Sequence, residues 1–264
     1  GYSRSAIALM EETGLLARVL PEVAALRGVA QPPDFHPEGD VWQHALLMLS
    51  EMDRALAEQP FYPLTAEMAA DNDKLLAREI IAWATLLHDI GKPATYSVAD
   101  RIRFHEHDKL GAEMAASVLD RLRRPGAVRE AVRDLIDRHI RFATLRRMRV
   151  AKLRRWLQET IFPLHLELHR LDCLASHGQL DNYRFGLEAW LAERARPPEP
   201  QPLVTGKDLL ALGYAPGPLL GNILRAVEDA RLEGRLTNRE DTIRWIIDNY
   251  HGPGMSGSKG RKGE

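Results

Sequence analysis

Six positions spread along the chain carry side chains that can bind a metal ion. Imidazole nitrogens and carboxylate oxygens together suit a divalent transition ion or Mg²⁺. Each position lies on, or at the end of, a segment with helical periodicity, and helices of one bundle can direct such ligands at a common centre. In chain order the six are His44, the adjacent pair His88 and Asp89, His107, His139 and Asp172.

The adjacent pair His88–Asp89 is the most informative part of this series. Sequence neighbours point about 100° apart on an ideal helix, so both can face one ion only near a helix end. The following Gly91-Lys92-Pro93 supplies that end, because Gly suits the left-handed position after a helix and Pro cannot continue one. The preceding stretch is apolar, and two polar groups buried there without a metal or partner would be costly. A single histidine on a helix is more often an ordinary core or surface residue, so the joint pattern is what favours a metal site.

Composition and charge narrow the class of protein that holds these residues. The 264 residues include 38 Leu and 32 Ala against 11 Val and 12 Ile, which predicts an all-α fold. The single cysteine, Cys173, excludes a disulfide framework and favours a reducing, cytoplasmic compartment. No apolar run reaches the roughly 18 residues that a membrane span needs, so we expect no membrane association. The net charge of -1 excludes a globally basic polymer binder, and any contact with nucleic acid requires a local patch.

Apolar periodicity and helix-breaking residues predict the helices that would position the candidate ligands. Asp40, with Gln43 three residues later, has the pattern of a capping box before the first ligand helix. We expect two short helices within residues 5–29, a non-helical segment at 31–39, and helices over about 41–57, 75–90, 108–123, 126–142, 150–158, 163–177 and 181–194.

A Pro-rich stretch at residues 196–202 has the composition of a stiff spacer and predicts a domain boundary. We expect an N-terminal helical segment at 1–35, a helical metal-binding domain at 36–195, a small helical unit at 203–250 and a disordered tail at 251–264. The chain starts at Gly1 without an initiator Met, which suggests a trimmed chain or a fragment.

The order of these motifs resembles a known family. The series His44, His88-Asp89 and Asp172 is similar to the HD superfamily of metal-dependent phosphohydrolases. More narrowly, three segments resemble the HD domain of bacterial tRNA nucleotidyltransferases, the CCA-adding enzymes: 35–44 (FHPEGDVWQH), 87–93 (LHDIGKP) and 104–111 (FHEHDKLG). Two further segments, 205–210 (TGKDLL) and 212–221 (LGYAPGPLLG), resemble the C-terminal part of the same family.

The resemblance implies a role for each candidate ligand. It makes His44, His88, Asp89 and Asp172 the ligands of one divalent ion, which would be Mn, Ni, Co, Fe or Mg. A second ion would be held by His107 and His139 with Asp89 as the bridge, and whether one or two ions bind is left open. His105 is an alternative to His107, because the two lie on the same side of an extended segment. A metal-activated water would be the nucleophile.

Other residues are candidates for contact with substrate, each with a structural alternative. Lys92 either contacts a substrate phosphate or is a solvated lysine at a helix end. His36 either lines the site or packs in a turn. Arg141 begins an acid-free basic run to Arg155, which either contacts RNA phosphates or reflects the general use of Arg over Lys, 29 to 7, in this chain. His165 and His169 either support the candidate ligand Asp172 from behind or are surface residues. The Gly-rich turn before Leu219 is either a phosphate site or a tight packing of helices.

The chain also departs from the family pattern. The nucleotidyl-transfer head of the family lies N-terminal to this region and carries an Asp-x-Asp pair, whereas only 35 residues precede His36. The sequence 71–73 (DND) has the right letters but lies in a polar loop before a helix, where Asp is a common cap. We therefore expect this chain to be unable to add CCA by itself.

Two functions remain in consideration. The first is a phosphohydrolase acting on phosphomonoesters or 2′,3′-cyclic phosphodiesters of nucleotides or RNA ends, because the family's HD domains are associated with phosphatase, 2′-nucleotidase and 2′,3′-cyclic phosphodiesterase activities. The second is a non-catalytic module, the body and tail of a nucleotidyltransferase that bind tRNA. Hydrolysis of a nucleoside triphosphate or signalling nucleotide fits less well, since the flanking motifs match the tRNA enzymes.

Overall fold

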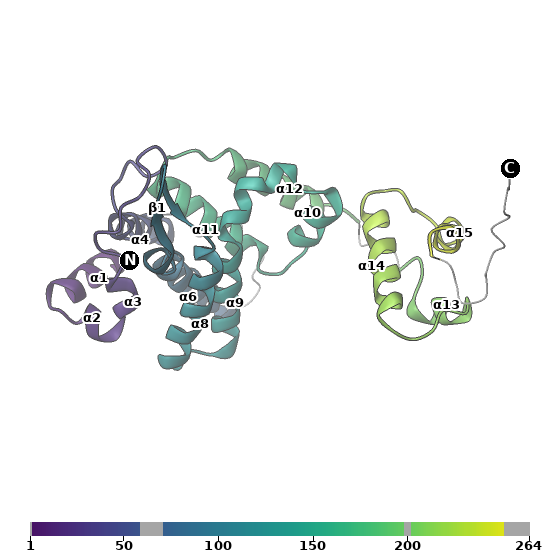
Figure 1. The fold of residues 1–264 in the computed structure, drawn as a ribbon, viewed down its shortest axis with the longest axis horizontal. Helices are drawn as coiled ribbons and strands as arrows, with labels where there is room; N and C mark the ends of the chain where they lie inside the picture. The colour runs from purple at the N-terminus through teal and green to yellow at the C-terminus, as the bar shows by residue number, and fades with distance from the viewer. Residues whose placement is uncertain (1, 59–70, 198–201, 251–264) are drawn as a thin grey trace. The chain divides into compact units, whose positions relative to one another are not determined.

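The computed structural model describes residues 2–58, 71–197 and 202–250, and in these residues the regular secondary structure is helical apart from one small hairpin. The predicted all-α fold is confirmed. Figure 1 shows the elements in chain order. The helices of the first half are α1 (Ser3–Glu12), α2 (Leu16–Val19), α3 (Pro21–Ala24), α4 (Val41–Glu58), α6 (Asp71–Leu87), α7 (Lys92–Thr95), α8 (His107–Arg121) and α9 (Gly126–Arg138). A 3₁₀ helix, η1 (His139–Arg147), then leads to α10 (Val150–Leu157), α11 (Phe162–Ala175), α12 (Asp181–Arg194), α13 (Gly206–Ala211), α14 (Pro218–Leu232) and α15 (Arg239–Asn249).

The chain folds into two compact units. Within the described residues, the first combines the chain up to Arg146 with 159–189, and the second combines 147–158 with the chain between residues 190 and 250. All six candidate ligands belong to the first unit. The domain boundaries given above remain predictions, and the expected tail at 251–264 and positions 198–201 of the Pro-rich stretch lie outside the described residues.

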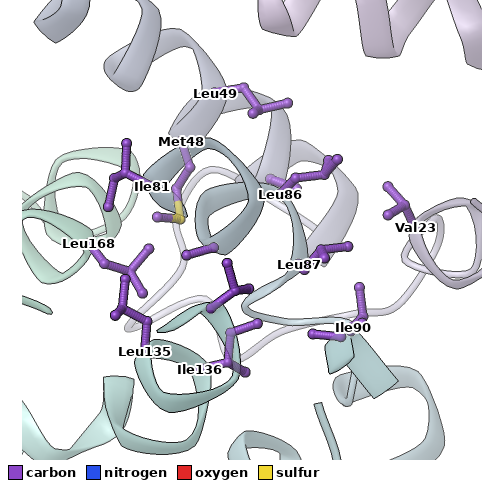
Figure 2. Packing of buried hydrophobic residues seen from close by; sticks show 14 of the residues in the cluster. Val23, Met48, Leu49, Ile81, Leu86, Leu87, Ile90, Leu135, Ile136 and Leu168 are labelled. Carbon is purple, nitrogen blue, oxygen red and sulfur yellow. The ribbon is translucent and has the colours of Figure 1, made fainter. Parts of the chain in front are cut away.

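The core of the first unit is built by the apolar faces of helices α4, α6, α9 and α11 (Figure 2). On α4 the buried residues Val41, Ala45, Met48 and Met52 recur at helical spacing, and His44 lies on the same face. The periodicity that buries this face therefore also carries the first candidate ligand into the interior. Figure 2 shows Met48 of α4 beside Ile81 of α6 in this cluster.

The end of α6 differs from the prediction. The helix stops at Leu87, and Lys92-Pro93 begins the short helix α7 instead of terminating the previous one, since Pro is well suited to the first turn. Gly91 has φ -78°, so it is not in the left-handed conformation. Its small size has another reason: a Cβ atom there would lie 2.2 Å from the His107 carbonyl oxygen.

Two other local features were not predicted. Strands β1 (Tyr96–Val98) and β2 (Ile102–Phe104) form an antiparallel hairpin in which Tyr96 pairs with Phe104. The helix expected to continue to residue 142 ends at Arg138 and changes to the tighter η1. The segment 71–73 forms the first turn of α6, but its side chains lie outside those described.

The second unit has its own small apolar core. Leu209, Tyr214, Ile223, Val227 and Ile246 pack together from α13, α14, α15 and the loop after α13. A capping box starts α13, because the Thr205 side chain accepts from the backbone N–H of Asp208 while the Asp208 carboxylate accepts from Thr205. None of the helices in the described part of the chain combines the length and apolar character that a membrane crossing requires.

Candidate metal centre

The fold brings the six sequence-predicted ligands to one region of the first unit. Each stands at a different structural position: His44 on α4, His88 and Asp89 in the turn after α6, His107 and His139 as the first residues of α8 and η1, and Asp172 on α11. The side chains of His44, His88 and Asp89 are fully or almost fully buried.

The first group of ligand atoms surrounds one end of the Asp89 carboxylate. His88 Nε2 lies 3.1 Å from Asp89 Oδ2, and His44 Nε2 lies 4.0 Å from the same oxygen. The Asp172 Oδ1 atom is 3.1 Å from His44 Nε2. Two ligands bound at about 2.1 Å and at right angles to one ion lie roughly 3 Å apart, so the two 3.1 Å spacings are compatible with a shared ion.

A second group of ligand atoms lies at the other oxygen of the same carboxylate. His107 Nε2 is 3.7 Å from Asp89 Oδ1 and 3.3 Å from His139 Nε2. The ligand atoms of Asp89, His107 and His139 all lie within 4.8 Å of one another, as do those of His44, His88 and Asp89. The two oxygens of Asp89 therefore face two different groups of histidine nitrogens.

The tautomers of the histidines can be inferred from the partners of their Nδ1 atoms. Three of the Nδ1 atoms face backbone carbonyl oxygens, which only accept hydrogen bonds, so these Nδ1 atoms must carry the proton and a neutral ring then has its lone pair on Nε2. The carbonyls belong to Thr85 for His88 (3.1 Å), Phe104 for His107 (2.9 Å) and Ile136 for His139 (2.6 Å).

The charges and lone pairs of these side chains fit divalent ions. Burial and the neighbouring His107 and His88 lower the pKa of His139 to about 4, so its ring is neutral and its lone pair faces His107 Nε2. Nε2 of His88 makes no well-aligned hydrogen bond, although a carboxylate oxygen lies close by. On the side of Asp89 Oδ1, the Nε2 atoms of His107 and His139 face one another without a donor between them, and a divalent ion would supply the missing positive charge.

The fourth histidine, His44, is held differently. Burial would lower its pKa, but the carboxylates of Asp172 and Glu38 more than offset this and raise the pKa to about 9. Burial opposes the ionisation of Asp172 as well, yet the hydrogen bond with His44 keeps the pKa of that carboxyl well below its usual range. Without an ion, the protonated His44 ring therefore balances the carboxylates.

Glu38 is a site residue that the sequence analysis did not single out. Its Oε1 atom lies 2.7 Å from His44 Nδ1 and 2.8 Å from His36 Nδ1, and the carboxylate is almost fully buried. A carboxylate behind a histidine ligand orients the ring and raises its basicity. In the sequence, the position of Glu38 in the loop directly before α4 could have indicated its role. The turn-forming residues of this loop already account for polar side chains there, so Glu38 did not stand out.

Lys92 is not a solvated lysine at a helix end, which corrects one of the two alternatives. It is 5% exposed, and its Nζ atom lies 2.8 Å from Asp89 Oδ2. Nζ also donates to Gln31 Oε1 at 2.6 Å and lies 5.2 Å from the centre of the Phe104 ring. The ammonium group therefore helps to hold the Asp89 carboxylate ionised and in place.

The remaining candidates separate into those at the site and those away from it. A cavity of about 630 Å³ is lined by His36, Lys92 and five of the six candidate ligands, with His44 as the exception. The His105 side chain is 90% exposed and does not line the cavity, so the geometry supports His107 as the ligand. Arg141 lies 3.6 Å from Asp137 and does not line it either.

Of two histidines that were considered possible surface residues, His165 is buried and His169 is partly buried. His165 lies 3.0 Å from Asp134 Oδ2, away from the candidate ligands. His169 lines the cavity and stacks on Phe142 with ring centres 4.4 Å apart. Burial lowers the pKa of both, to about 4 in His169.

The basic run from Arg141 to Arg155 is also divided by the fold. In the second unit, Arg154 is buried and pairs with Glu193, and Arg155 pairs with Asp229. These two arginines are structural, which reduces the part of the run that is available to RNA.

Comparisons with known proteins agree with this geometry. Residues 62–175 match the HD domain, and residues 198–247 match a family described as tRNA nucleotidyltransferase domain 2, putative. The chain resembles the HD and C-terminal parts of tRNA nucleotidyltransferases. The resemblance that the sequence motifs predicted is confirmed.

Individual relatives extend over most of the chain. It is 33% identical to the A-adding tRNA nucleotidyltransferase of Deinococcus radiodurans over 253 residues, which cover 91% of this chain and 53% of the relative. It is likewise 33% identical to the CC-adding tRNA nucleotidyltransferase of Thermus thermophilus, over 90% of this chain and 51% of the relative. A multifunctional CCA protein of Pseudomonas aeruginosa is 31% identical over 69% of this chain and 39% of the relative. The chain thus spans about half the length of the first two relatives.

Proposed function

We propose that the first unit of this HD protein is a metal-dependent phosphohydrolase. Its substrates are phosphomonoesters or 2′,3′-cyclic phosphodiesters of nucleotides or of RNA 3′ ends. The observation that carries the proposal is the position of Asp89 between two groups of histidine Nε2 atoms at one wall of a cavity. Four imidazoles and two carboxylates favour transition ions such as Mn, Ni, Co or Fe over Mg²⁺.

The residues of the chain have distinct tasks in this reaction. Bound ions would supply a water of lowered pKa and would polarise the phosphoryl oxygens. Asp89 and Asp172 stay ionised at neutral pH, because nearby imidazoles and Lys92 lower the pKa of Asp89 and His44 lowers that of Asp172, against the effect of burial. His36, with its Nδ1 atom held by Glu38, presents its ring to the cavity, and Lys92 fixes Asp89.

The reaction is balanced without another reactant. Water adds to the phosphorus of the cyclic diester, one bond from phosphorus to a ribose oxygen breaks, and the proton of the water passes to that oxygen. The products are a ribose hydroxyl and a phosphomonoester.

A second candidate function is binding of tRNA without hydrolysis. It is favoured by the match of residues 198–247 and by relatives named as A-adding and CC-adding tRNA nucleotidyltransferases. In that case the ions would have a structural role or none, and the protein would serve as a binding module.

Elemental analysis combined with a hydrolysis assay separates the two functions. We expect purified protein to bind one or two divalent ions per chain and to hydrolyse adenosine 2′,3′-cyclic phosphate. His88→Ala and Asp89→Ala should abolish both properties, whereas Asp120→Ala, a change of an exposed carboxylate on α8, should leave both intact. Protein that is metal-free and inactive but still shifts tRNA in a gel would contradict the hydrolase and support the binding module.

A further inference from the structure

The 3₁₀ helix η1 presents two different faces. Side chains at positions i and i+3 eclipse one another in a 3₁₀ helix. One such row starts at the candidate ligand His139 and continues with Phe142 and Leu145, which are fully buried. The next row contains Ile140, Ala143 and Arg146, and all three line the cavity. The tight winding, which is unusual over nine residues, thus places Arg146 on the wall of the same cavity as the metal ligands.

The guanidinium group of Arg146 is held in place without being neutralised. It donates to the backbone carbonyl oxygen of Asp181 at 2.9 Å and lies 5.7 Å from the centre of the Phe185 ring. The carboxylate of Asp181 is 71% exposed and lies 4.0 Å from Arg184 instead. The other cationic side chain of the cavity wall, Lys92, is engaged by Asp89. Among the described residues, Arg146 is therefore the cation of this wall that has no carboxylate partner.

The position of Arg146 separates it from the metal centre. Arg146 follows His139 by seven positions of the 3₁₀ helix, which corresponds to about 14 Å along the helix axis. The phosphate that reacts at the metal ligands would therefore not be the group that Arg146 contacts. A planar guanidinium with free N–H groups favours a phosphate, which it can bind through two parallel hydrogen bonds.

We propose that Arg146 binds a second phosphate of the substrate, on the 5′ side of the nucleoside whose 2′,3′-cyclic phosphate reacts. The inference rests on the proposed phosphohydrolase function and specifies its substrate class. The protein then prefers an RNA 3′ end, or a nucleotide with a 5′-phosphate, to a nucleoside cyclic phosphate that has no second phosphate.

Three substrates test this preference in the metal-loaded protein. They are adenosine 2′,3′-cyclic phosphate, the same compound with a 5′-phosphate, and the dinucleotide ApA that ends in a 2′,3′-cyclic phosphate. We expect kcat/KM to be roughly tenfold or more higher for a substrate with a second phosphate, which is the effect of a charge-assisted hydrogen bond. A preference confined to the dinucleotide identifies the internucleotide phosphate as the group recognised, and one shared by both identifies the 5′-phosphate in general.

Variants of Arg146 show whether this residue is responsible. Arg146→Gln should remove the preference and leave kcat/KM for adenosine 2′,3′-cyclic phosphate unchanged. Arg146→Lys should retain part of the preference, because lysine keeps the charge but not the fork. The control is Arg133→Gln on α9, where the arginine is exposed and pairs with Glu113. Equal rates of the wild-type protein on all three substrates, or an equal loss on all three in Arg146→Gln, would overturn the inference.

A binding experiment keeps the inference testable if the protein hydrolyses none of the substrates. Calorimetric titration with adenosine 3′-monophosphate and adenosine 3′,5′-bisphosphate measures the contribution of the second phosphate directly. We expect Arg146→Gln to weaken binding of the bisphosphate only. An equal affinity of the wild-type protein and the variant for the bisphosphate would refute the role of Arg146, whereas a lack of hydrolysis alone would refute only the proposed function.

Discussion

Asp89 is the residue on which the candidate metal centre depends. Its two oxygens face different histidines, with His88 Nε2 3.1 Å from Oδ2 and His107 Nε2 3.7 Å from Oδ1. Lys92 adds a cation 2.8 Å from Oδ2. A buried carboxylate of this kind is stable only with such partners, so each neighbour of Asp89 contributes to the charge balance of the site.

The pKa of His44 predicts a coupling between metal binding and pH. Because this pKa is raised to about 9, His44 is protonated in the metal-free protein at neutral pH, and an ion that binds Nε2 must displace the proton. Affinity for the ion should therefore increase with pH until the pH reaches about 9. Calorimetry in two buffers with different ionisation enthalpies measures the released proton, and an affinity that is constant between neutral pH and pH 9 would count against His44 as a ligand.

Replacing Glu38 should weaken one group of ligands and spare the other. Glu38→Gln removes the charge behind His44, and loss of such a partner typically lowers metal affinity by about 10–100-fold. The ion near His107 and His139 should bind as before, because their Nδ1 atoms are held by backbone carbonyls.

Stepwise titration with Co²⁺, followed by absorption and calorimetry, resolves the two binding steps of this variant. Glu11→Gln is the matched control, since Glu11 pairs with Arg27 at the surface. Equal weakening of both steps would show that Glu38 acts on the whole fold and not on His44.

At the scale of elements, close packing of two glycines brings the ligand segments together. Gly91 follows the His88–Asp89 pair, and Gly111 lies one turn into α8 after His107. A Cβ atom on Gly91 would lie 2.2 Å from the His107 carbonyl oxygen and 2.8 Å from the Gly111 nitrogen. The two turns can therefore approach this closely because Gly91 has no side chain, whereas a Cβ atom on Gly111 would lie 3.3 Å from the Gly91 nitrogen.

Gly91→Ala should accordingly destabilise the protein. Backbone atoms must move to admit the methyl group, and overpacking of this kind costs about 1–3 kcal/mol in the free energy of unfolding. Gly126→Ala on α9 is the control, because a Cβ atom there meets nothing within 4 Å and a less flexible unfolded chain should stabilise the protein by about 0.4–1 kcal/mol. Urea unfolding measures both, and a Gly91→Ala variant as stable as the wild type would contradict the close approach.

At the scale of the whole molecule, buried histidines set the pH dependence of stability. The pKa values of His139 and His169 are lowered to about 4 in the folded protein, compared with about 6.5 for an ordinary histidine. As the pH falls below about 6.5, these histidines therefore take up protons in the unfolded chain but not in the folded protein, and stability decreases. His44 has the opposite sign: its stabilising proton is fully present below about 6.5 and is lost as the pH rises through about 9. The free energy of unfolding of metal-free protein should therefore be greatest near pH 6.5 and decrease on both sides.

Urea unfolding in the presence of a chelator, repeated from acidic to alkaline pH, measures this profile. His169→Phe should make the acid side shallower, because phenylalanine keeps the stacking on Phe142 and cannot be protonated. Stability that increases steadily from pH 6.5 down to pH 4 would contradict the assignment of neutral, buried rings.

Features of this protein that depend on local pattern can be predicted from its residues alone. Leu and Ala recur every three to four residues and so predict the helices, because this spacing places apolar side chains on the one face of a helix that is buried. The His–Asp pair before Gly91 and the spaced histidines predict a metal site, and the surrounding motifs identify the resemblance to tRNA nucleotidyltransferases, which the comparisons confirm.

Only the tertiary structure decided how these residues meet. Contacts between segments determine three features of the site: the hydrogen bond between Glu38 and His44, the burial of Lys92 beside Asp89 and the exposure of His105. The tight winding of η1 places Arg146 on the cavity wall, whereas periodicity predicts an ordinary helix that ends at about residue 142. The reason is physical: the spacing of apolar residues encodes which face of an element is buried, but the partner of each polar group is set by the packing of whole elements against one another.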